Sequence, residues 1–101
     1  MSFPDEYLIL GIPTRDAETW NAIEQKLSYA FSDKFVNLRK YISEYGLSDN
    51  SITPTSDDKT AMRKGAIPPS LLNSDGIHLN DYGYIAMANC IYQRGVSLGY
   101  W

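Results

Sequence analysis

A short apolar run near the start of the chain, Tyr7 to Ile12, constrains the fold more than any other segment. It is continuously apolar and is ended by Gly11 and Pro13. A strand buried on both faces of a parallel sheet has this pattern, whereas a strand with one solvated face alternates apolar and polar residues. The run therefore predicts a parallel strand, and a parallel partner can be reached only through a crossover connection.

The next segment supplies that connection. Asp16 can cap a helix, and apolar residues follow it at spacings of three and four: Trp20, Ile23, Leu27, Ala30 and Phe31. At this spacing we interpret the aromatic pair, Trp20 and Phe31, as core residues rather than as a ligand stack. Phe35 to Leu38 predicts a second strand. The three segments form a strand–helix–strand unit, for which we expect parallel strands and a right-handed crossover.

A less regular stretch follows. Residues 39–46 predict a short helix, and residues 47–73 are polar and contain prolines. Within them, Thr55 and Asp58 have the spacing of a capping box, and Gly65 has the character of a helix stop. A stretch of this length without periodicity is uncommon in a compact domain. It either walls a binding cleft or forms a plain surface loop.

The C-terminal segment predicts a helix over about residues 81–98, with Asn80 as its N-cap. The residues expected on its buried face are Tyr84, Ile85, Ala88, Ile91, Tyr92 and Gly95. The small residues expected to permit close approach to a sheet are Gly83, Ala86 and Gly95. Cys90 is the only cysteine, which excludes an internal disulfide and a cysteine-based zinc site, and we expect it to be buried.

The composition is that of an ordinary globular chain, with 44% hydrophobic and 21% charged residues among 101, and this length suits one small domain. A net charge of −3 and a pI near 4.9 argue against nucleic acid as a partner. The longest apolar run is far shorter than the roughly 18 residues of a membrane-spanning helix. The first residues lack the basic and apolar parts of an export signal, so none is expected and the compartment stays open.

The tetrapeptide Asp75-Gly-Ile-His78 precedes the C-terminal helix and contains the only histidine. A carboxylate at this spacing can orient the imidazole through Nδ1 and leave Nε2 free to take a proton from a nucleophile. The plain alternative is a turn, because Asp-Gly is a common turn dipeptide and a lone histidine is usually structural. The chain contains no serine or cysteine in a recognisable nucleophile turn. The sequence therefore predicts two members of a hydrolytic triad, Asp75 and His78, without the third.

The residues around this pair extend the pattern. Pro68 to Asn89 read Pro-Pro-Ser-Leu-Leu-Asn-Ser-Asp-Gly-Ile-His-Leu-Asn-Asp-Tyr-Gly-Tyr-Ile-Ala-Met-Ala-Asn. This segment resembles the last conserved block of the SGNH (GDSL-type) hydrolases, in which Asp-Gly-x-His-Leu-Asn and a Gly-Tyr helix carry the acid and base of the triad. Residues 8–14, 35–42 and 52–62 resemble earlier parts of that family's C-terminal half. The family's Gly-Asp-Ser block, which supplies the nucleophile, and its blocks with the other oxyanion donors have no counterpart here.

The resemblance implies a partial three-layer α/β/α fold of the flavodoxin-like SGNH type, with parallel strands and flanking helices. Residues 1–101 would be the C-terminal part of a single domain whose N-terminal half is absent. Asp75 matches the orienting acid and His78 the general base, with no cofactor and no metal ion. The implied function is that of the C-terminal segment of a serine esterase acting on acyl or acetyl esters, with esters of carbohydrates among the candidates.

A second function stays open, that of a non-catalytic structural or interaction module that retains this framework, for example in a cell-surface or viral tail protein. The Asp75–His78 pair favours the esterase, and the missing nucleophile favours the module. The expected partners are an ester substrate and, through the Tyr7–Ile12 strand, either the missing N-terminal half or another copy of the chain. An apolar strand with an unpaired edge is expected to find such a partner.

Overall fold

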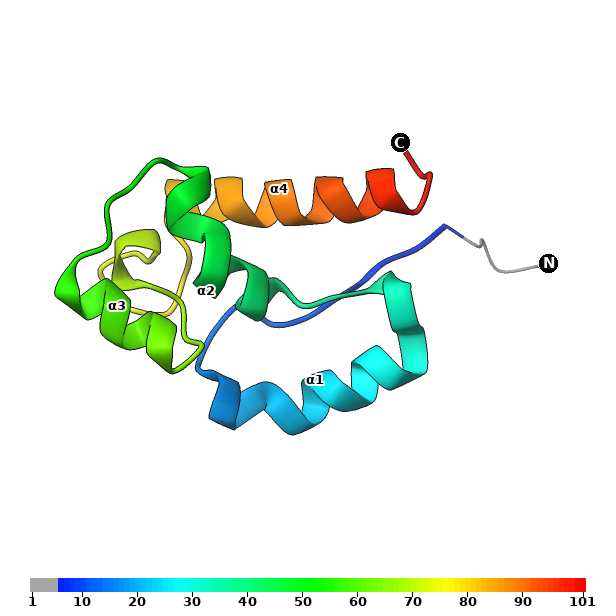
Figure 1. The fold of residues 1–101 in the computed structure, drawn as a ribbon, viewed down its shortest axis with the longest axis horizontal. Coiled ribbons are helices and arrows are strands. Elements are labelled where there is room, and N and C mark those ends of the chain that lie inside the picture. Colours follow the sequence, from blue (N-terminus) through cyan, green and yellow to red (C-terminus); the bar gives the residue numbers. More distant parts are fainter. Residues whose placement is uncertain (1–5) are drawn as a thin grey trace.

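Two parallel strands, β1 (Ile9–Leu10) and β2 (Phe35–Val36), lie at the centre of the computed structural model, which describes residues 6–101 (Figure 1). Within this range the helices are α1 (Ala17–Phe31), α2 (Leu38–Asp49), α3 (Ser56–Arg63) and α4 (Asp81–Ser97), with 3₁₀ turns η1 (Ser32–Lys34) and η2 (Pro69–Leu71). The fold is therefore mixed α/β and mostly helical. Residues 1–5, on which the expectation about an export signal depends, lie outside the described range.

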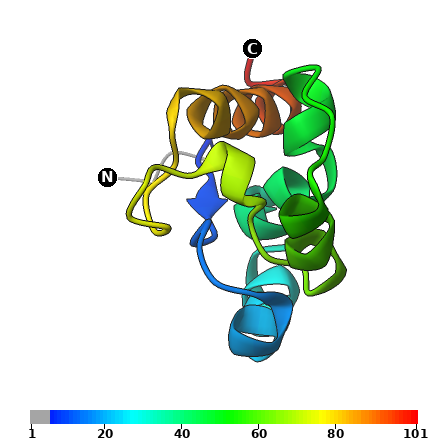
Figure 2. The ribbon, with the colours of Figure 1, turned by 90° about the vertical axis from the view of Figure 1, so that its left-hand side faces the viewer.

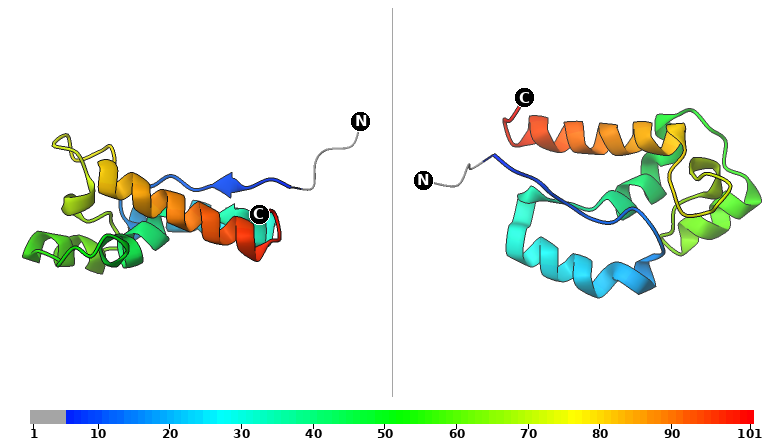
Figure 3. Two further views of the ribbon diagram at one scale, coloured as in Figure 1. Left: turned by 90° about the horizontal axis from the view of Figure 1, so that it is seen from above. Right: turned by 180° about the vertical axis from the view of Figure 1, so that it is seen from behind.

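The expected strand–helix–strand unit is present. The register pairs Ile9 with Phe35 and Leu10 with Val36, and the strands are parallel, as predicted. Gly11 N also donates to Val36 O at 2.9 Å, so the pairing continues one residue beyond β1. Helix α1 and helix α4 lie on opposite sides of this strand pair (Figure 3).

Both strands are shorter than the sequence predicted. The apolar run Tyr7–Ile12 contributes only two residues to the sheet, since β2 offers it only two partners. Leu38 was expected to end the second strand, but it is the first residue of α2. The reason is local, because the side chain of Asn37 accepts a hydrogen bond from Lys40 N at 3.1 Å and so begins the helix one residue earlier.

Helix α1 begins as predicted. Asp16 accepts a hydrogen bond from Thr19 N at 2.9 Å and caps the helix. The predicted apolar face is only partly covered, because Trp20, Leu27 and Phe31 are half-buried whereas Ile23 and Ala30 are exposed. The only buried residue of this helix is Glu24. Trp20 and Phe31, interpreted from sequence as core residues, are half-buried and lie outside the core cluster.

The hydrophobic core lies between β2, α2, α4 and the chain from Ile67 to Leu79. Its buried members are Val36, Leu38, Ile42, Leu47, Ile67, Leu71, Leu79, Ala86 and Cys90. Viewed along the long axis, α4 lies above β1, α1 lies below it, and α2 and α3 lie to one side (Figure 2). The core therefore lies on the side of the strands where α2 packs, and α1 lies outside it.

Helix α4 buries a different face from the one predicted. Tyr84, Ile85, Ala88 and Tyr92 are exposed, whereas the buried residues are Gly83, Ala86, Cys90 and Gly95. The small residues permit close approach, but not to the sheet. A Cβ atom on Gly83 would lie 2.5 Å from Leu71 O, and one on Gly95 would overlap the Trp101 ring. Cys90 is buried as predicted, and burial raises the pKa of its thiol to about 11.

The middle stretch is more ordered than predicted. Helix α2 continues to Asp49, and α3 and η2 lie within residues 47–73. The capping box is confirmed, since Thr55 and Asp58 exchange hydrogen bonds at the start of α3. Gly65 ends this helix with a φ of +67°, a left-handed conformation that glycine adopts without strain. No helix in the described part of the chain has both the length and the apolar character needed to cross a bilayer.

Candidate functional site

Asp75 and His78 lie in contact in the loop that precedes α4. His78 Nδ1 is 2.6 Å from Asp75 Oδ2, which is the contact that the sequence predicted. The other carboxylate oxygen, Oδ1, accepts hydrogen bonds from Ile77 N at 2.8 Å and from His78 N at 3.0 Å. Gly76 has a φ of +69°, so the turn uses the freedom of glycine at this position. Both oxygens of Asp75 are thus occupied, and the imidazole is held by one nitrogen.

The pair lies at the surface. The side chain of His78 is 71% exposed and that of Asp75 is 44% exposed. Within residues 6–101, no serine, threonine or cysteine forms a hydrogen bond with the His78 ring. The second ring nitrogen, Nε2, is therefore open toward solvent or toward a group from another chain. The structure brings the two predicted residues together and adds no nucleophile to them.

The charge on Asp75 decides which nitrogen of His78 carries the proton. Hydrogen bonding from the His78 side chain, and then from the backbone N–H groups of Ile77 and His78, lowers the pKa of Asp75 to about 2. At neutral pH Asp75 is a carboxylate and can only accept hydrogen bonds. In the neutral imidazole the proton must then reside on Nδ1, which leaves the Nε2 lone pair free to act as a base.

We expect the His78→Ala variant to raise the pKa of Asp75 from about 2 toward its ordinary value of 3.8, because the largest cause of the shift is removed. The backbone donors remain, so the pKa should stay below 3.8. Carboxyl ¹³C NMR over a pH titration measures this directly. Asp16, which caps α1, should titrate identically in both proteins. An unchanged Asp75 titration would show that the two side chains do not interact in solution.

Asn80 anchors the C-terminal end of the loop. Its Oδ1 accepts from Gly83 N at 3.0 Å, which caps α4 as predicted, and its Nδ2 donates to Ser70 O at 2.9 Å and to Leu72 O at 3.2 Å. Its backbone N donates to Leu71 O at 2.9 Å. Asn80 therefore joins the start of α4 to the turn η2. The loop with Asp75 and His78 connects these two elements, so Asn80 holds both of its ends.

Asp58 holds η2 from the other side. This fully buried carboxylate accepts from Ser70 N at 3.0 Å through Oδ1 and from Ser70 Oγ at 2.7 Å through Oδ2. The sequence identified Asp58 only as part of a capping box. Its contact with Ser70 joins residues twelve apart, and local sequence carries no signal for such a contact. Asp58 and Asn80 are positioning residues for the loop.

An apolar groove of about 410 Å³ runs beside this loop. Its lining residues are Thr14, Arg15, Ala66, Ile67, Leu72 and Ile77, together with Gly76. Thr14 and Arg15 follow β1, so the groove lies at the carboxyl end of this strand, where open α/β sheets bind their ligands. Arg15 has a φ of +61°, an uncommon conformation for a residue other than glycine. The sequence had not identified either residue as a candidate for the site.

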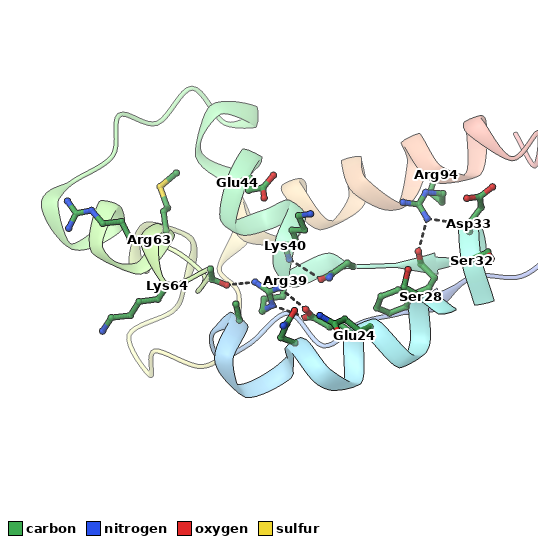
Figure 4. Close-up of a pocket in the computed structure, with 17 residues that line it drawn as sticks. Glu24, Ser28, Ser32, Asp33, Arg39, Lys40, Glu44, Arg63, Lys64 and Arg94 are labelled. Carbon is green, nitrogen blue, oxygen red and sulfur yellow. Dashed lines mark hydrogen bonds and ion pairs between the residues drawn. The ribbon is translucent and has the colours of Figure 1, made fainter. Parts of the chain in front are cut away.

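A larger groove lies elsewhere, between α1 and α2, and has a volume of about 920 Å³ (Figure 4). Its polar centre is Arg39, which donates through Nε and Nη2 to Glu24 and through Nη1 to Gly65 O. Arg39 and Glu24 are both buried, and the guanidinium is committed to partners within the chain. We therefore interpret this groove as the surface above a structural ion pair and not as the candidate site.

The arrangement at the loop can perform one kind of chemistry. A carboxylate-oriented imidazole with an open Nε2 can accept a proton from a hydroxyl group placed next to it. Within residues 6–101, no three or more His, Cys, Asp or Glu side chains are grouped closely enough to hold a metal ion. Searches with this chain found no matching protein-family model, no matching curated protein and no matching solved structure.

Proposed function

We propose that this chain is the C-terminal segment of a serine ester hydrolase of the SGNH type, and that it supplies Asp75 and His78 to a Ser-His-Asp triad. The observation that carries the proposal is the 2.6 Å contact of Asp75 Oδ2 with His78 Nδ1, with Nε2 left open. The parallel strands with a helix on each side are compatible with part of a three-layer α/β/α domain. The substrates would be acyl or acetyl esters, with esters of carbohydrates among them.

The mechanism assigns each side chain a step. A serine from sequence outside these 101 residues attacks the ester carbonyl, and His78 Nε2 takes the hydroxyl proton as the new C–O bond forms. Asp75 keeps the imidazole in the Nδ1–H tautomer and stabilises the imidazolium. His78 then returns the proton to the departing alkoxide, which leaves as the alcohol. Water repeats the cycle to release the acid and restore the serine.

The position of the loop is compatible with a serine that comes from a separate segment. In Figure 2 the loop (yellow) projects on the side of β1 that no described helix covers. A segment that carried the nucleophile could therefore approach His78 from this open side. The apolar groove at the carboxyl end of β1 would lie next to the reacting ester.

One observation favours the second candidate, a non-catalytic structural or interaction module. No hydroxyl or thiol of the described residues is bonded to His78, so residues 6–101 place no nucleophile beside it for an acyl-enzyme. We accordingly expect no labelling of the chain alone by a fluorophosphonate probe. A labelled serine would show that the chain contains its own nucleophile and that the division proposed here is wrong.

The decisive experiment joins the chain to the coding sequence that precedes Met1 in its source. If that sequence holds a Gly-Asp-Ser block, the joined polypeptide should hydrolyse p-nitrophenyl acetate and take up one fluorophosphonate. Asp75→Asn should then lower kcat by roughly 10⁴-fold, because the imidazole loses its tautomer. Asp57→Asn is the matched control, because it makes the same substitution at an exposed position of α3, and it should leave kcat unchanged. An active joined enzyme that tolerates Asp75→Asn and His78→Ala would refute the proposal, and the absence of a nucleophile block would support the module.

A further inference from the structure

The two edges of the small sheet differ in whether their backbone groups are free to pair with a further strand. At the outer edge of β2, Arg94 from α4 donates through Nη1 to Phe35 O at 2.6 Å and to Asp33 O at 2.8 Å. An arginine that occupies the carbonyls of an edge strand prevents pairing with a further strand. The outer edge of β1 has no such cover among the described residues. In Figure 3 (right) no described element crosses in front of β1.

The backbone groups on that edge can be assigned from the register. Ile9 and Gly11 face β2, because Ile9 pairs with Phe35 and Gly11 N donates to Val36 O. Successive residues of a strand direct their backbone groups to opposite edges. The N–H and C=O groups of Leu8, Leu10 and Ile12 therefore point away from the sheet, and no described residue hydrogen-bonds to them.

The side chains beside this edge are apolar. Leu10 is 47% exposed, and it lines a shallow hollow together with Leu8, Ile91 and Trp101. A second hollow continues from Ile91 and Trp101 over Met87 and Tyr92 on α4. We call these six residues the β1–α4 patch. None of the six carries a charge, whereas Glu6 also lines the first hollow. Leu8, Met87 and Ile91 pack partly against the core, and Leu10, Tyr92 and Trp101 are exposed.

We propose that this patch binds a second copy of the chain, with β1 pairing antiparallel to β1 of the other copy about a two-fold axis. The three outward residues are symmetric about Leu10, so Leu10 faces Leu10 of the second copy while Leu8 faces its Ile12. In this register each outward N–H and C=O meets its counterpart, which is the self-complementarity that a two-fold interface requires. Pro13 has no N–H and ends the ladder.

The chemistry of the patch agrees with self-association. The six residues of the patch carry no charge, so they can meet their own copy without like-charge repulsion, and the apolar side chains of two copies would leave water together. The axis stands normal to the sheet, so the α4 helices of both copies lie on one side and extend the patch across the interface. The result is a four-stranded sheet in the order β2, β1, β1, β2. This proposal does not rest on the proposed function.

The first test is the mass of the purified 101-residue chain by light scattering across a concentration series. We expect twice the chain mass of 11.4 kDa. Leu10→Lys should convert it to a monomer with an unchanged helical circular dichroism spectrum, because a charge would be buried at the axis. Tyr45→Lys is the matched control. Tyr45 is 51% exposed and belongs to α2, a helix that does not lie along the free edge of β1 (Figure 3), so this variant should remain dimeric.

A crosslinking test keeps the proposal falsifiable if Leu10→Lys fails to fold. In the proposed register the two Leu10 Cα atoms are about 5.5 Å apart, within the range that a disulfide spans. Oxidation with copper–phenanthroline should thus convert Leu10→Cys into a disulfide-linked dimer, and a reductant should cleave this disulfide. The two Ile12 positions lie about 14 Å apart along the strands, so Ile12→Cys should not crosslink. Both variants retain the buried Cys90.

Two results would overturn the proposal. A monodisperse monomer at the highest soluble concentration would mean that the edge is reserved for another occupant, such as a strand of the nucleophile-bearing segment. Equal crosslinking of Leu10→Cys and Ile12→Cys would mean that copies meet without the proposed register. Neither result touches the triad assignment, which depends on Asp75 and His78 and is tested by the joined polypeptide.

Discussion

Glu24→Ala is expected to destabilise the protein by about 3–5 kcal/mol, since removal of one partner from a buried ion pair leaves the other charge uncompensated. Arg39 donates to Glu24 through Nη2 at 2.6 Å and through Nε at 2.7 Å, and the two side chains are 6% and 9% exposed. After the substitution only Gly65 O would still accept from this guanidinium. Urea unfolding followed by circular dichroism measures the change.

Two controls separate the buried charge from a simple loss of contacts. Glu18→Ala removes the same charge from the exposed first turn of α1 and should change stability by no more than about 0.5 kcal/mol. The double variant Glu24→Leu with Arg39→Met should be milder than Glu24→Ala, because it removes both charges. If Glu24→Ala proved no worse than Glu18→Ala, the pair would not be buried in solution.

The ion pair also sets a pH dependence. Burial by itself would raise the pKa of Glu24, but the hydrogen bonds from Arg39 and Asn37 together with the charges of Arg39 and Lys40 outweigh it, so the pKa lies below its ordinary value of 4.5. A carboxyl group whose pKa is lowered by folding contributes its full stabilisation above the unfolded-state pKa and loses it as pH falls through the folded-state pKa. The acid-induced loss of stability should therefore be smaller in Glu24→Ala than in the parent chain.

The Asp58→Ala variant is expected to cost about 3 kcal/mol, because it leaves the part-buried donors of Ser70 and Thr55 without this acceptor and removes half of the capping box of α3. Asp58 is fully buried and accepts from Ser70 N, Ser70 Oγ and Thr55 N at 2.7–3.0 Å. The loss should spread beyond α3. Since Ser70 O accepts from Asn80, we expect faster amide exchange at Ser70 and at the cap of α4.

Asp57→Ala is the matched control, since it removes a neighbouring exposed carboxylate from the same first turn. It should stay within about 0.5 kcal/mol of the parent chain. Burial alone would raise the pKa of Asp58, but the hydrogen bonds from Ser70 and Thr55 lower it below 3.8. Its contribution is therefore complete above that pH and declines as pH falls further. An Asp58→Ala variant as stable as Asp57→Ala would show that Ser70 finds another acceptor.

The triad assignment and the proposed pairing of copies depend on different residues of the chain. The triad assignment depends on the loop from Asp75 to His78, which Asp58 and Asn80 position from two sides. The pairing of copies depends on the outward backbone groups of Leu8, Leu10 and Ile12 along the free edge of β1, and not on the side chains of the loop. Variants at Leu10 should therefore leave the Asp75 titration unchanged, and variants at Asp75 should leave the mass of the assembly unchanged.

Local features were predictable from sequence. The helix caps at Asp16, Thr55 and Asn80, and the contact of Asp75 with His78, join residues no more than three positions apart. At that separation, side-chain length and backbone preference decide which groups meet, whatever the rest of the chain does. The same holds for the parallel strand–helix–strand unit, because a connection through a helix allows few other arrangements.

Only the tertiary structure decided which surfaces are buried. Helix α4 is apolar on more than one face, so its sequence is compatible with burying Tyr84 and Tyr92 or with burying Gly83 and Cys90, and packing against α2 and η2 selected the second. Glu24 occurs among exposed positions of α1, and only the distant Arg39 makes its burial favourable. By itself, the sequence determined the local turns, caps and strand direction, which short-range chemistry controls. Burial depends on partners far along the chain, and no single segment encodes them.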